Sequence, residues 1–277
     1  MLADDIALAQ KIVSGSNFNV SLQGQPYHSS SFIYRKTNEK INEYQTYLQG
    51  RKKVASVIAS GNQILNSVYE GANDITAFDI SSFPEYYFKL QLAAISVYLR
   101  DELCDFLYND SMNDEVKDDM YFGINTKLDF ETKKFWDSLF QFFDWSDIKQ
   151  STLFSSDAIF LDQVIEQNKY LQSDVCYEQL RHNLRDTNFD FYTGDICSLA
   201  KNFPVEYDFI NLSSIVYYKK IAEYQQLLKE LPLQEQGQVL TYLYDVLQVE
   251  DSLAMPNCSF EKFSNDSSGV MIYTKRK

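Results

Sequence analysis

The sequence has little of the residue types on which several common kinds of site depend. Its 277 residues include only two histidines, and its four cysteines are scattered with no C-x-x-C pair. Histidine-based metal sites and Ser-His-Asp or Cys-His catalysis therefore have little material, and neither a zinc spacing nor a disulfide framework is indicated. Nine glycines and five prolines argue against a linker-rich chain. We expect no bound metal.

The sequence also lacks an apolar run as long as a membrane span. Its first ten residues, MLADDIALAQ, are acidic where a secretory signal would be basic. These features, together with the scattered cysteines, predict a cytoplasmic protein with no transmembrane segment. They leave the oligomeric state open.

Positive charge is scarce as well. The formal net charge is -14, and residues 101–162 hold fifteen Asp and Glu against five Lys. A nucleic-acid groove or a site for an anionic membrane needs the opposite sign, so we expect neither partner. The acidic stretch is typical of solvated helix faces. It is also compatible with a neutral or cationic small-molecule or peptide acceptor.

Short apolar runs separated by helical patterns are the main feature that is present. The predicted strands are Val54–Ala59, Ile75–Ile80, Phe189–Thr193, Tyr207–Leu212, Val239–Tyr244 and a terminal hairpin, Cys258–Phe263 with Val270–Lys275. Alternation of strands and helices predicts an α/β fold with a mostly parallel sheet covered by helices on both faces. The hairpin makes seven strands, with the last one antiparallel.

Residues 114–185 contain no convincing strand, which places a long helical insert between the second and third strands. We therefore expect an N-terminal helical segment over residues 1–50 and a ligand-binding domain over 51–277. The insert occupies about 101–187. Its aromatic side chains fit a core, or alternatively the lining of an acceptor pocket.

Polar residues follow four of the predicted strands. Ser60, Gly61 and Asn62 follow the first strand, and Asp79 ends the second. A glycine lets the backbone approach a ligand, and an acid at the next strand end can accept both hydroxyls of a ribose. The other interpretation of Asp79 is a cap of the following helix.

Two further strand ends complete the pattern. Asp195 and Ile196 follow the third strand, where an acid and an apolar side chain could contact an adenine. Asn211, Ser213 and Ser214 follow the fourth. Ligands of open α/β sheets bind beyond these carboxyl ends. A G-x-G-x-x-G fingerprint is absent, which disfavours a nucleotide-dependent oxidoreductase.

This order resembles the Rossmann-like class I fold of S-adenosylmethionine-dependent methyltransferases. More closely, SGNQILN, FDIS, KLQLAAI and FINLSSI are similar to the diacylglycerol 3-amino-3-carboxypropyltransferase-like proteins, over about Ser31–Ala94 and Phe189–Tyr218. The resemblance implies S-adenosylmethionine as the donor. It implies donor-binding roles for Ser60, Gly61, Asn62, Asp79, Ile80, Asp195, Ile196, Asn211 and Ser213.

The acceptor side is less defined. Candidates are Tyr34, Thr37, Ser214, Tyr217 and Tyr218, and no catalytic base is identified. The resemblance favours transfer of the 3-amino-3-carboxypropyl group. Methyl transfer is the alternative, because it dominates the fold, and a non-catalytic donor-binding or scaffold protein is the second alternative. One departure from the lipid-directed members, the absence of an Arg near VLTYLY, argues against a lipid acceptor.

Overall fold

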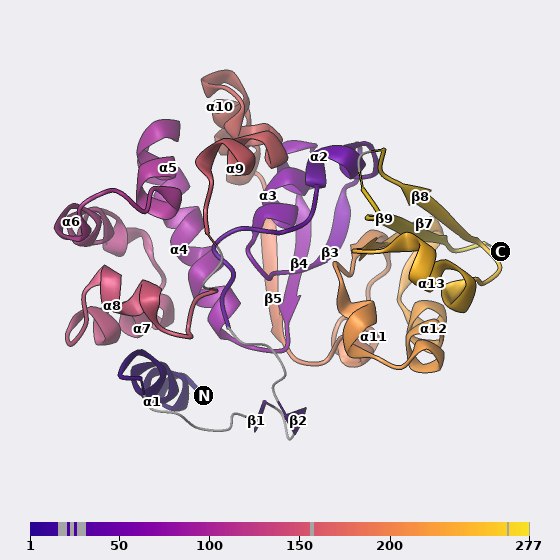
Figure 1. The fold of residues 1–277 in the computed structure, drawn as a ribbon, viewed down its shortest axis with the longest axis horizontal. Coiled ribbons are helices and arrows are strands. Elements are labelled where there is room, and N and C mark those ends of the chain that lie inside the picture. The colour runs from indigo at the N-terminus through magenta and orange to yellow at the C-terminus, as the bar shows by residue number, and fades with distance from the viewer. Residues whose placement is uncertain (16–20, 23–24, 27–31, 156–157, 265, 277) are drawn as a thin grey trace. The chain divides into compact units, whose positions relative to one another are not determined.

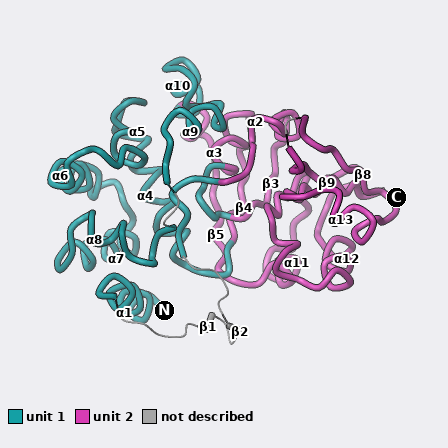
Figure 2. The backbone as a smooth tube through the Cα atoms, viewed as in Figure 1, with its two compact units in different colours: residues 1–37, 58–62, 79–181 teal, residues 38–57, 63–78, 182–277 magenta. Residues whose placement is uncertain are grey.

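The structure is a computed structural model that describes residues 1–15, 21–22, 25–26, 32–155, 158–264 and 266–276. These residues form two compact units, shown in Figure 2. Residues 1–37, 58–62 and 79–181 form the first, which we call the helical unit. Residues 38–57, 63–78 and 182–277 form the second, which we call the sheet unit.

A seven-stranded sheet, most of whose strands are labelled in Figure 1, is the framework of the sheet unit, in the order β5-β4-β3-β6-β7-β9-β8. The strands are β3 (Lys53–Val57), β4 (Asp74–Asp79), β5 (Asn188–Thr193), β6 (Tyr207–Asn211), β7 (Leu233–Leu243), β8 (Cys258–Lys262) and β9 (Gly269–Thr274). The pairs β3–β4, β3–β6 and β6–β7 are parallel, whereas β9 is antiparallel to β7 and β8. The predicted seven-stranded, mostly parallel sheet with a C-terminal hairpin is confirmed.

Burial explains why these runs form central strands. Val54, Ala55 and Ser56 are consecutive in β3, and all three are fully buried. Because successive side chains point to opposite faces of a sheet, both faces of β3 must be covered. The helices of this unit are α2 (Ile41–Tyr44), α3 (Asn62–Tyr69, in the sheet unit from Gln63), α11 (Leu199–Asn202), α12 (Ile221–Glu230) and α13 (Val246–Leu253), with 3-10 turns η1 (Gln45–Tyr47), η4 (Ile196–Ser198) and η5 (Ile215–Tyr218).

The helical unit contains most of the predicted insert. Its helices are α1 (Leu2–Val13), α4 (Phe83–Val97), α5 (Arg100–Tyr108), α6 (Asp114–Ile124), α7 (Phe130–Phe140), α8 (Trp145–Gln150), α9 (Leu161–Gln167) and α10 (Asp174–Arg185, mostly in this unit), with η2 (Asn125–Lys127) and η3 (Lys169–Leu171). Phe135, Trp136 and Trp145 are fully buried and pack ring against ring. These aromatics of the insert therefore form a core.

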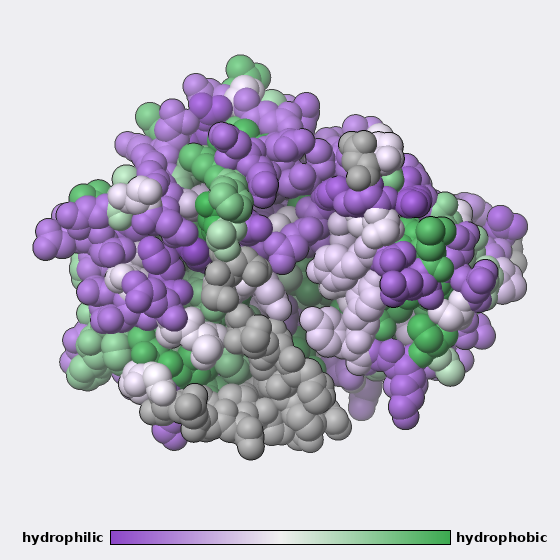
Figure 3. All heavy atoms as spheres, in the orientation of Figure 1, coloured by the Kyte–Doolittle hydropathy of each residue, from purple (hydrophilic) through white to green (hydrophobic). Residues whose placement is uncertain are grey.

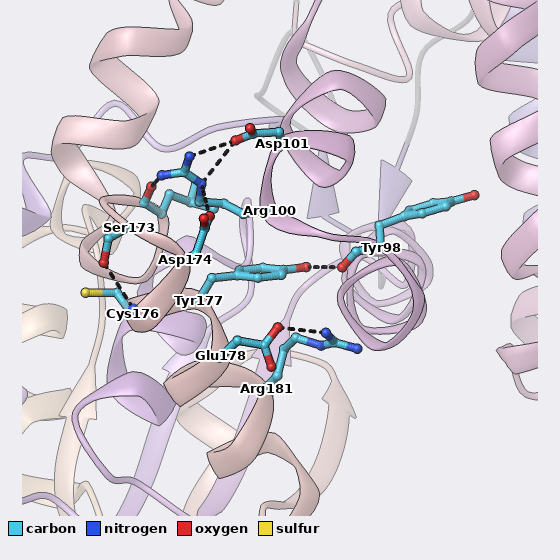
Figure 4. A network of polar contacts seen from close by, with 10 residues as sticks. Tyr98, Arg100, Asp101, Ser173, Asp174, Cys176, Tyr177, Glu178 and Arg181 are labelled. Atoms are coloured by element: carbon cyan, nitrogen blue, oxygen red, sulfur yellow. Dashed lines mark hydrogen bonds and ion pairs between the residues drawn. The ribbon is translucent and has the colours of Figure 1, made fainter.

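Residues 83–108 form two helices, α4 and α5, which are separated at Tyr98 and Leu99. Figure 4 shows how α10 holds this junction. The Tyr177 hydroxyl donates to the Tyr98 carbonyl at 3.0 Å, and Arg100 pairs with Asp174 at 3.0 Å. The carbonyl that a continuous helix would use internally is instead capped by a side chain, which explains the break.

The two units differ from the predicted boundaries. Helix α1 packs against α7, so the first residues of the chain share a unit with the insert. Residues 1–50 also hold a two-stranded pair, β1 (Ser21–Leu22) with β2 (Gln25–Pro26), and residues 16–20, 23–24 and 27–31 of that segment lie outside the described part. The predicted domain boundaries stay a prediction.

Two features relevant to function are absent from the described residues. No helix there is both long and apolar enough to cross a membrane. No group of three or more His, Cys, Asp or Glu side chains there is placed to hold a metal ion. All four cysteines are unpaired thiols. On the face drawn in Figure 3, hydrophilic residues cover most of the surface.

Candidate functional site

The loop after β3 makes a tight turn that requires its glycine. Gly61 has φ +81°, in the left-handed region that favours glycine, and its N–H donates to the Ile58 carbonyl at 2.6 Å. A Cβ at Gly61 would lie 2.5 Å from the Phe88 ring and 2.6 Å from Gln91 Oε1. Gln91 also donates to the Ser60 carbonyl at 2.9 Å. Helix α4 therefore packs directly on this turn and fixes its backbone.

Asn62 anchors the same loop. Its Nδ2 donates to the hydroxyls of Tyr108 at 3.3 Å and Tyr170 at 3.1 Å. Its Oδ1 accepts from the Thr37 N–H at 3.0 Å and from the Ser60 hydroxyl at 2.9 Å. Both ends of this buried amide are thus occupied inside the helical unit. Direct donor binding by the Asn62 side chain would require breaking these bonds, and its predicted role stays a prediction.

Asp79 ends β4 beside this loop, and its carboxylate is held by backbone groups alone. It accepts from the N–H groups of Ala59 and Ser81, both at 3.2 Å. Burial raises the pKa of Asp79 to about 6, and these backbone hydrogen bonds oppose that rise. No cation among the described residues forms an ion pair with it. A carboxylate has about four acceptor positions, so Asp79 keeps acceptor capacity beyond its backbone hydrogen bonds.

The third strand end has a different setting. Asp195 accepts from the Cys197 N–H at 2.9 Å and pairs with Lys219 at 3.3 Å. Although burial alone would raise the pKa of Asp195, the Cys197 hydrogen bonds and the Lys219 ammonium hold it below its usual value. Ile196 is only 4% exposed, in the core of the sheet unit. Ile80, by contrast, is 38% exposed.

The end of β6 is a strained, polar turn. Ser213 has φ +51°, which is uncommon for a residue other than glycine, and its N–H donates to Asn211 Oδ1 at 2.8 Å. Its carbonyl accepts from the Tyr242 N–H at 2.8 Å. Asn211 Nδ2 forms no hydrogen bond of good geometry with a described acceptor. It lies close to the Tyr44 hydroxyl, and this proximity opposes the increase in the Tyr44 pKa that burial causes.

Glu39 reaches this turn from the segment before β3, and sequence reasoning missed it. The side chain is buried, and it accepts from the Tyr44 hydroxyl at 2.7 Å and from the Ser213 hydroxyl. Burial raises the pKa of Glu39, against the hydrogen bonds from Ser213, Tyr44 and Gln63. Nothing in TNEK distinguishes this glutamate from a helix-start residue, because its partner lies 174 positions along the chain.

Tyrosines gather beside the same turn. The Tyr217 hydroxyl accepts from the Tyr244 N–H at 2.8 Å, and the two rings lie 5.5 Å apart. The Tyr242 ring lies 5.3 Å from Tyr244. Burial raises the pKa of Tyr244 to about 12, with a hydrogen bond from Ser214 acting the other way. Tyr218 is 64% exposed.

The predicted site residues therefore form two groups that the structure describes separately. Those in the helical unit are Tyr34, Thr37, Ser60, Gly61, Asn62, Asp79 and Ile80. Those in the sheet unit are Asp195, Ile196, Asn211, Ser213, Ser214, Tyr217 and Tyr218. Hydrogen bonds connect Thr37 to Asn62 and Ala59 to Asp79 in the first group, and Asn211 to Ser213 in the second.

Comparison with known proteins gives no sequence relative: no protein-family model and no curated protein matches the chain. Solved structures match most of the chain at low identity. An rRNA methylase from Streptococcus thermophilus shares 7% identity over 87% of this chain and 98% of that chain, with a TM-score of 0.41. A ribosomal protein L11 methylase from Lactobacillus delbrueckii subsp. bulgaricus shares 14% identity over 87% and 80%, with a TM-score of 0.39.

A third solved structure, the N-methyltransferase NodS from Bradyrhizobium japonicum WM9, shares 7% identity over 87% of this chain and 99% of that chain, with a TM-score of 0.36. The strand order defines the architecture. Five strands are followed by an antiparallel hairpin in which β9 lies between β7 and β8. The architecture is the predicted one, a Rossmann-like α/β fold with a seven-stranded sheet that ends in an antiparallel hairpin. Activity does not follow from fold alone and depends on the residues of the site.

Proposed function

We propose that this chain is an S-adenosylmethionine-dependent transferase whose donor binds beyond the carboxyl ends of β3 and β4. The observation that carries the proposal is the Asp79 carboxylate, which is held by the Ala59 and Ser81 N–H groups and forms no ion pair with a described cation. It lies at the end of a central strand, beside a glycine turn. Strand order reverses between β3 and β6, where ligands of such sheets bind.

The proposed roles follow from what each group can still do. Asp79 accepts the two ribose hydroxyls of the donor, and the backbone at Ser60 and Gly61 lies against its amino-acid part. For the sheet unit, the sequence pattern alone assigns Asp195 and Ile196 to the adenine and Asn211 and Ser213 to the reacting end. Ile80 of the helical unit is a further donor-binding candidate. The unbonded Asn211 Nδ2 is a buried donor that a ligand oxygen would satisfy.

Two different groups of the donor could be transferred. Attack on the γ-carbon of the donor's aminobutyrate arm releases 5′-methylthioadenosine, whereas attack on the methyl releases S-adenosylhomocysteine. The protein's contribution to either is to hold donor and acceptor in line. The similarity of SGNQILN, KLQLAAI and FINLSSI to aminocarboxypropyltransferase-like proteins favours the first, and methyl transfer is the alternative.

The acceptor side is proposed to take an amine of a small molecule or peptide, in neutral or cationic form. The rings of Tyr217 and Tyr244 offer π-faces, which attract cations. The buried Glu39 carboxyl group accepts hydrogen bonds from Tyr44 and Ser213 beside the turn after β6. This interpretation supports a nitrogen nucleophile more than an anionic one.

Titration calorimetry with S-adenosylmethionine and S-adenosylhomocysteine tests donor use. We expect both to bind and to raise the melting temperature by mass action. Failure of both at millimolar concentration would overturn the proposal and leave the scaffold alternative.

Product analysis tests the group transferred. The protein is incubated with the donor and a panel of amines, and the nucleoside product is identified by mass spectrometry. Enzyme-dependent methylthioadenosine, above the donor's spontaneous breakdown, supports aminocarboxypropyl transfer. S-Adenosylhomocysteine instead makes the protein a methyltransferase.

A further inference from the structure

Three cationic side chains meet inside the helical unit, although the sequence of this region is strongly acidic. The Arg35 guanidinium donates two hydrogen bonds to the Asp110 carboxylate, with Nη1 2.6 Å from Oδ1 and Nη2 3.2 Å from Oδ2. Lys149 in α8 lies 3.5 Å from the same Oδ1. Lys117 in α6 lies close enough to all three for their charges to act on its pKa. We call these four residues the cationic cluster.

Lys117 is the member of the cationic cluster whose positive charge is least compensated. Its side chain is fully buried, and its Nζ has no hydrogen-bond partner anywhere in the described ranges. Arg35 Nε is likewise buried without a partner among those residues. An unpaired buried ammonium costs several kcal/mol, so a group in this state calls for a counter-charge. Burial, with repulsion from Lys149, lowers the pKa of Lys117 to about 8, which leaves it mostly protonated at neutral pH.

The carboxylates nearby do not balance the cluster. Asp110 is shared by Arg35 and Lys149, and one charge cannot neutralise three. Asp114, one helical turn before Lys117, has a buried oxygen that also lacks a hydrogen bond within the described part of the chain. Counting both acids, the cluster keeps one excess positive charge.

We propose that the cationic cluster is a binding site for a small oxyanion, either a phosphate group or a carboxylate. Lys117 Nζ and Arg35 Nε supply the unused donors, and Lys149 adds a third cation. Phosphate and carboxylate share this chemistry, because both present several oxygens to Lys and Arg donors. The Asp110 side chain, 40% exposed, is the solvent-facing member of the cluster, so an anion enters by displacing it.

This site is separate from the proposed donor site in the residues that form it. Arg35, Asp110, Lys117 and Lys149 share no residue with the Gly61 and Asp79 loops. Its occupant would be either a free anion or the anionic part of a larger ligand. The proposal does not rest on S-adenosylmethionine binding, and its test needs no donor.

The test is thermal unfolding of the full chain in sodium phosphate and in sodium acetate, each against sodium chloride at equal ionic strength. We expect a saturable rise of roughly 2–4 °C at an anion concentration several times its dissociation constant. A response to phosphate alone identifies a phosphate site, and a response to acetate identifies a carboxylate site. Calorimetric titration with phosphate or acetate should give one site per chain.

Lys117→Met is the decisive variant, because methionine fills similar volume without charge. We expect it to lose the anion response and to melt higher than the wild type in chloride, since the buried charge is gone. Lys127→Met removes an exposed lysine of the same unit and should keep the full response. Lys149→Met, at the edge of the cluster, should weaken the response without abolishing it.

Two outcomes would overturn the proposal. One is a wild-type protein that responds to phosphate and acetate no more than to chloride. The other is an anion response that survives in Lys117→Met. Either result would mean that Lys117 is neutralised within the helical unit, by rotation toward Asp114.

Discussion

Asp79 and Asp195 both follow a strand of the same sheet, yet the structure gives them opposite settings. Asp79 is held by two backbone N–H groups, and burial raises its pKa to about 6. Asp195 caps the turn at Ile196–Ser198 and pairs with Lys219, with a lowered pKa. The sequence pattern is the same in both, and only the partner differs.

The comparison shows that a carboxylate at a strand end is not always available to bind a ligand. A carboxylate at a strand end is near any ligand that binds there, but it contributes only if its acceptor capacity and charge are free. Lys219 already neutralises Asp195, whereas the N–H groups that hold Asp79 carry no formal charge. We therefore expect Asp79 to dominate donor binding and the Asp195 side chain, which also caps a turn, to contribute less at the adenine.

Substitution of each acid by alanine should give the largest contrast. Each charge-assisted hydrogen bond contributes about 1.5–3 kcal/mol, so Asp79→Ala should weaken S-adenosylmethionine binding by at least about tenfold. Asp195→Ala should change the affinity by less than about threefold. Calorimetric dissociation constants of both variants make the measurement. Equal losses would show that the two acids contribute alike.

The glycines of the two loops extend the comparison to the backbone. Gly61→Ala combines a left-handed φ with contacts of 2.5 and 2.6 Å to α4, so we expect it to lose about 2 kcal/mol of unfolding free energy. Gly194→Ala has no such φ, and the three atoms nearest its new methyl all belong to the Tyr192 side chain, whose outer end can move. A smaller loss is expected there. Urea unfolding of both variants measures the two losses of unfolding free energy. A loss in Gly194→Ala as large as that in Gly61→Ala would contradict this expectation.

The pH dependence of the two acids should have opposite signs. The pKa of Asp79 is raised from 3.8 to about 6, so its contribution to stability is fully present below pH 3.8 and is lost as the pH rises through about 6. The ionised form accepts ribose hydroxyls better, so donor affinity should rise several-fold across the same window. Asp79→Asn should flatten this profile. Asp195, with a lowered pKa, should lose its contribution only as the pH falls below its usual range.

Removal of the Asp195 partner should have the smallest effect. Lys219→Met breaks a pair whose side chains are 18% and 47% exposed, and such pairs contribute about 0.2–1 kcal/mol. Unfolding free energy should therefore fall by less than about 1 kcal/mol. If donor affinity instead rose several-fold, Asp195 would be an available ligand that Lys219 suppresses.

Local patterns were enough to predict the sheet. Runs such as Val54–Ala59 and Tyr207–Leu212 are short, apolar and bounded by turn residues, so their length and composition predict strands. Their order along the chain, with the terminal hairpin, also predicted a mostly parallel sheet. Gly61 and Asp79 could be named because the carboxyl ends of parallel strands meet at one edge.

Long-range partners decided the rest. Glu39 meets Ser213 across 174 positions, Lys219 neutralises Asp195, and the Tyr177 hydroxyl binds the Tyr98 carbonyl between α4 and α5. Lys117 is an ordinary helix lysine in the sequence, and only packing buries it away from any described partner. The sequence by itself determined which strands form and where polar groups end them. Tertiary structure decided which of those groups are paired, because burial and pairing depend on residues brought together only by folding.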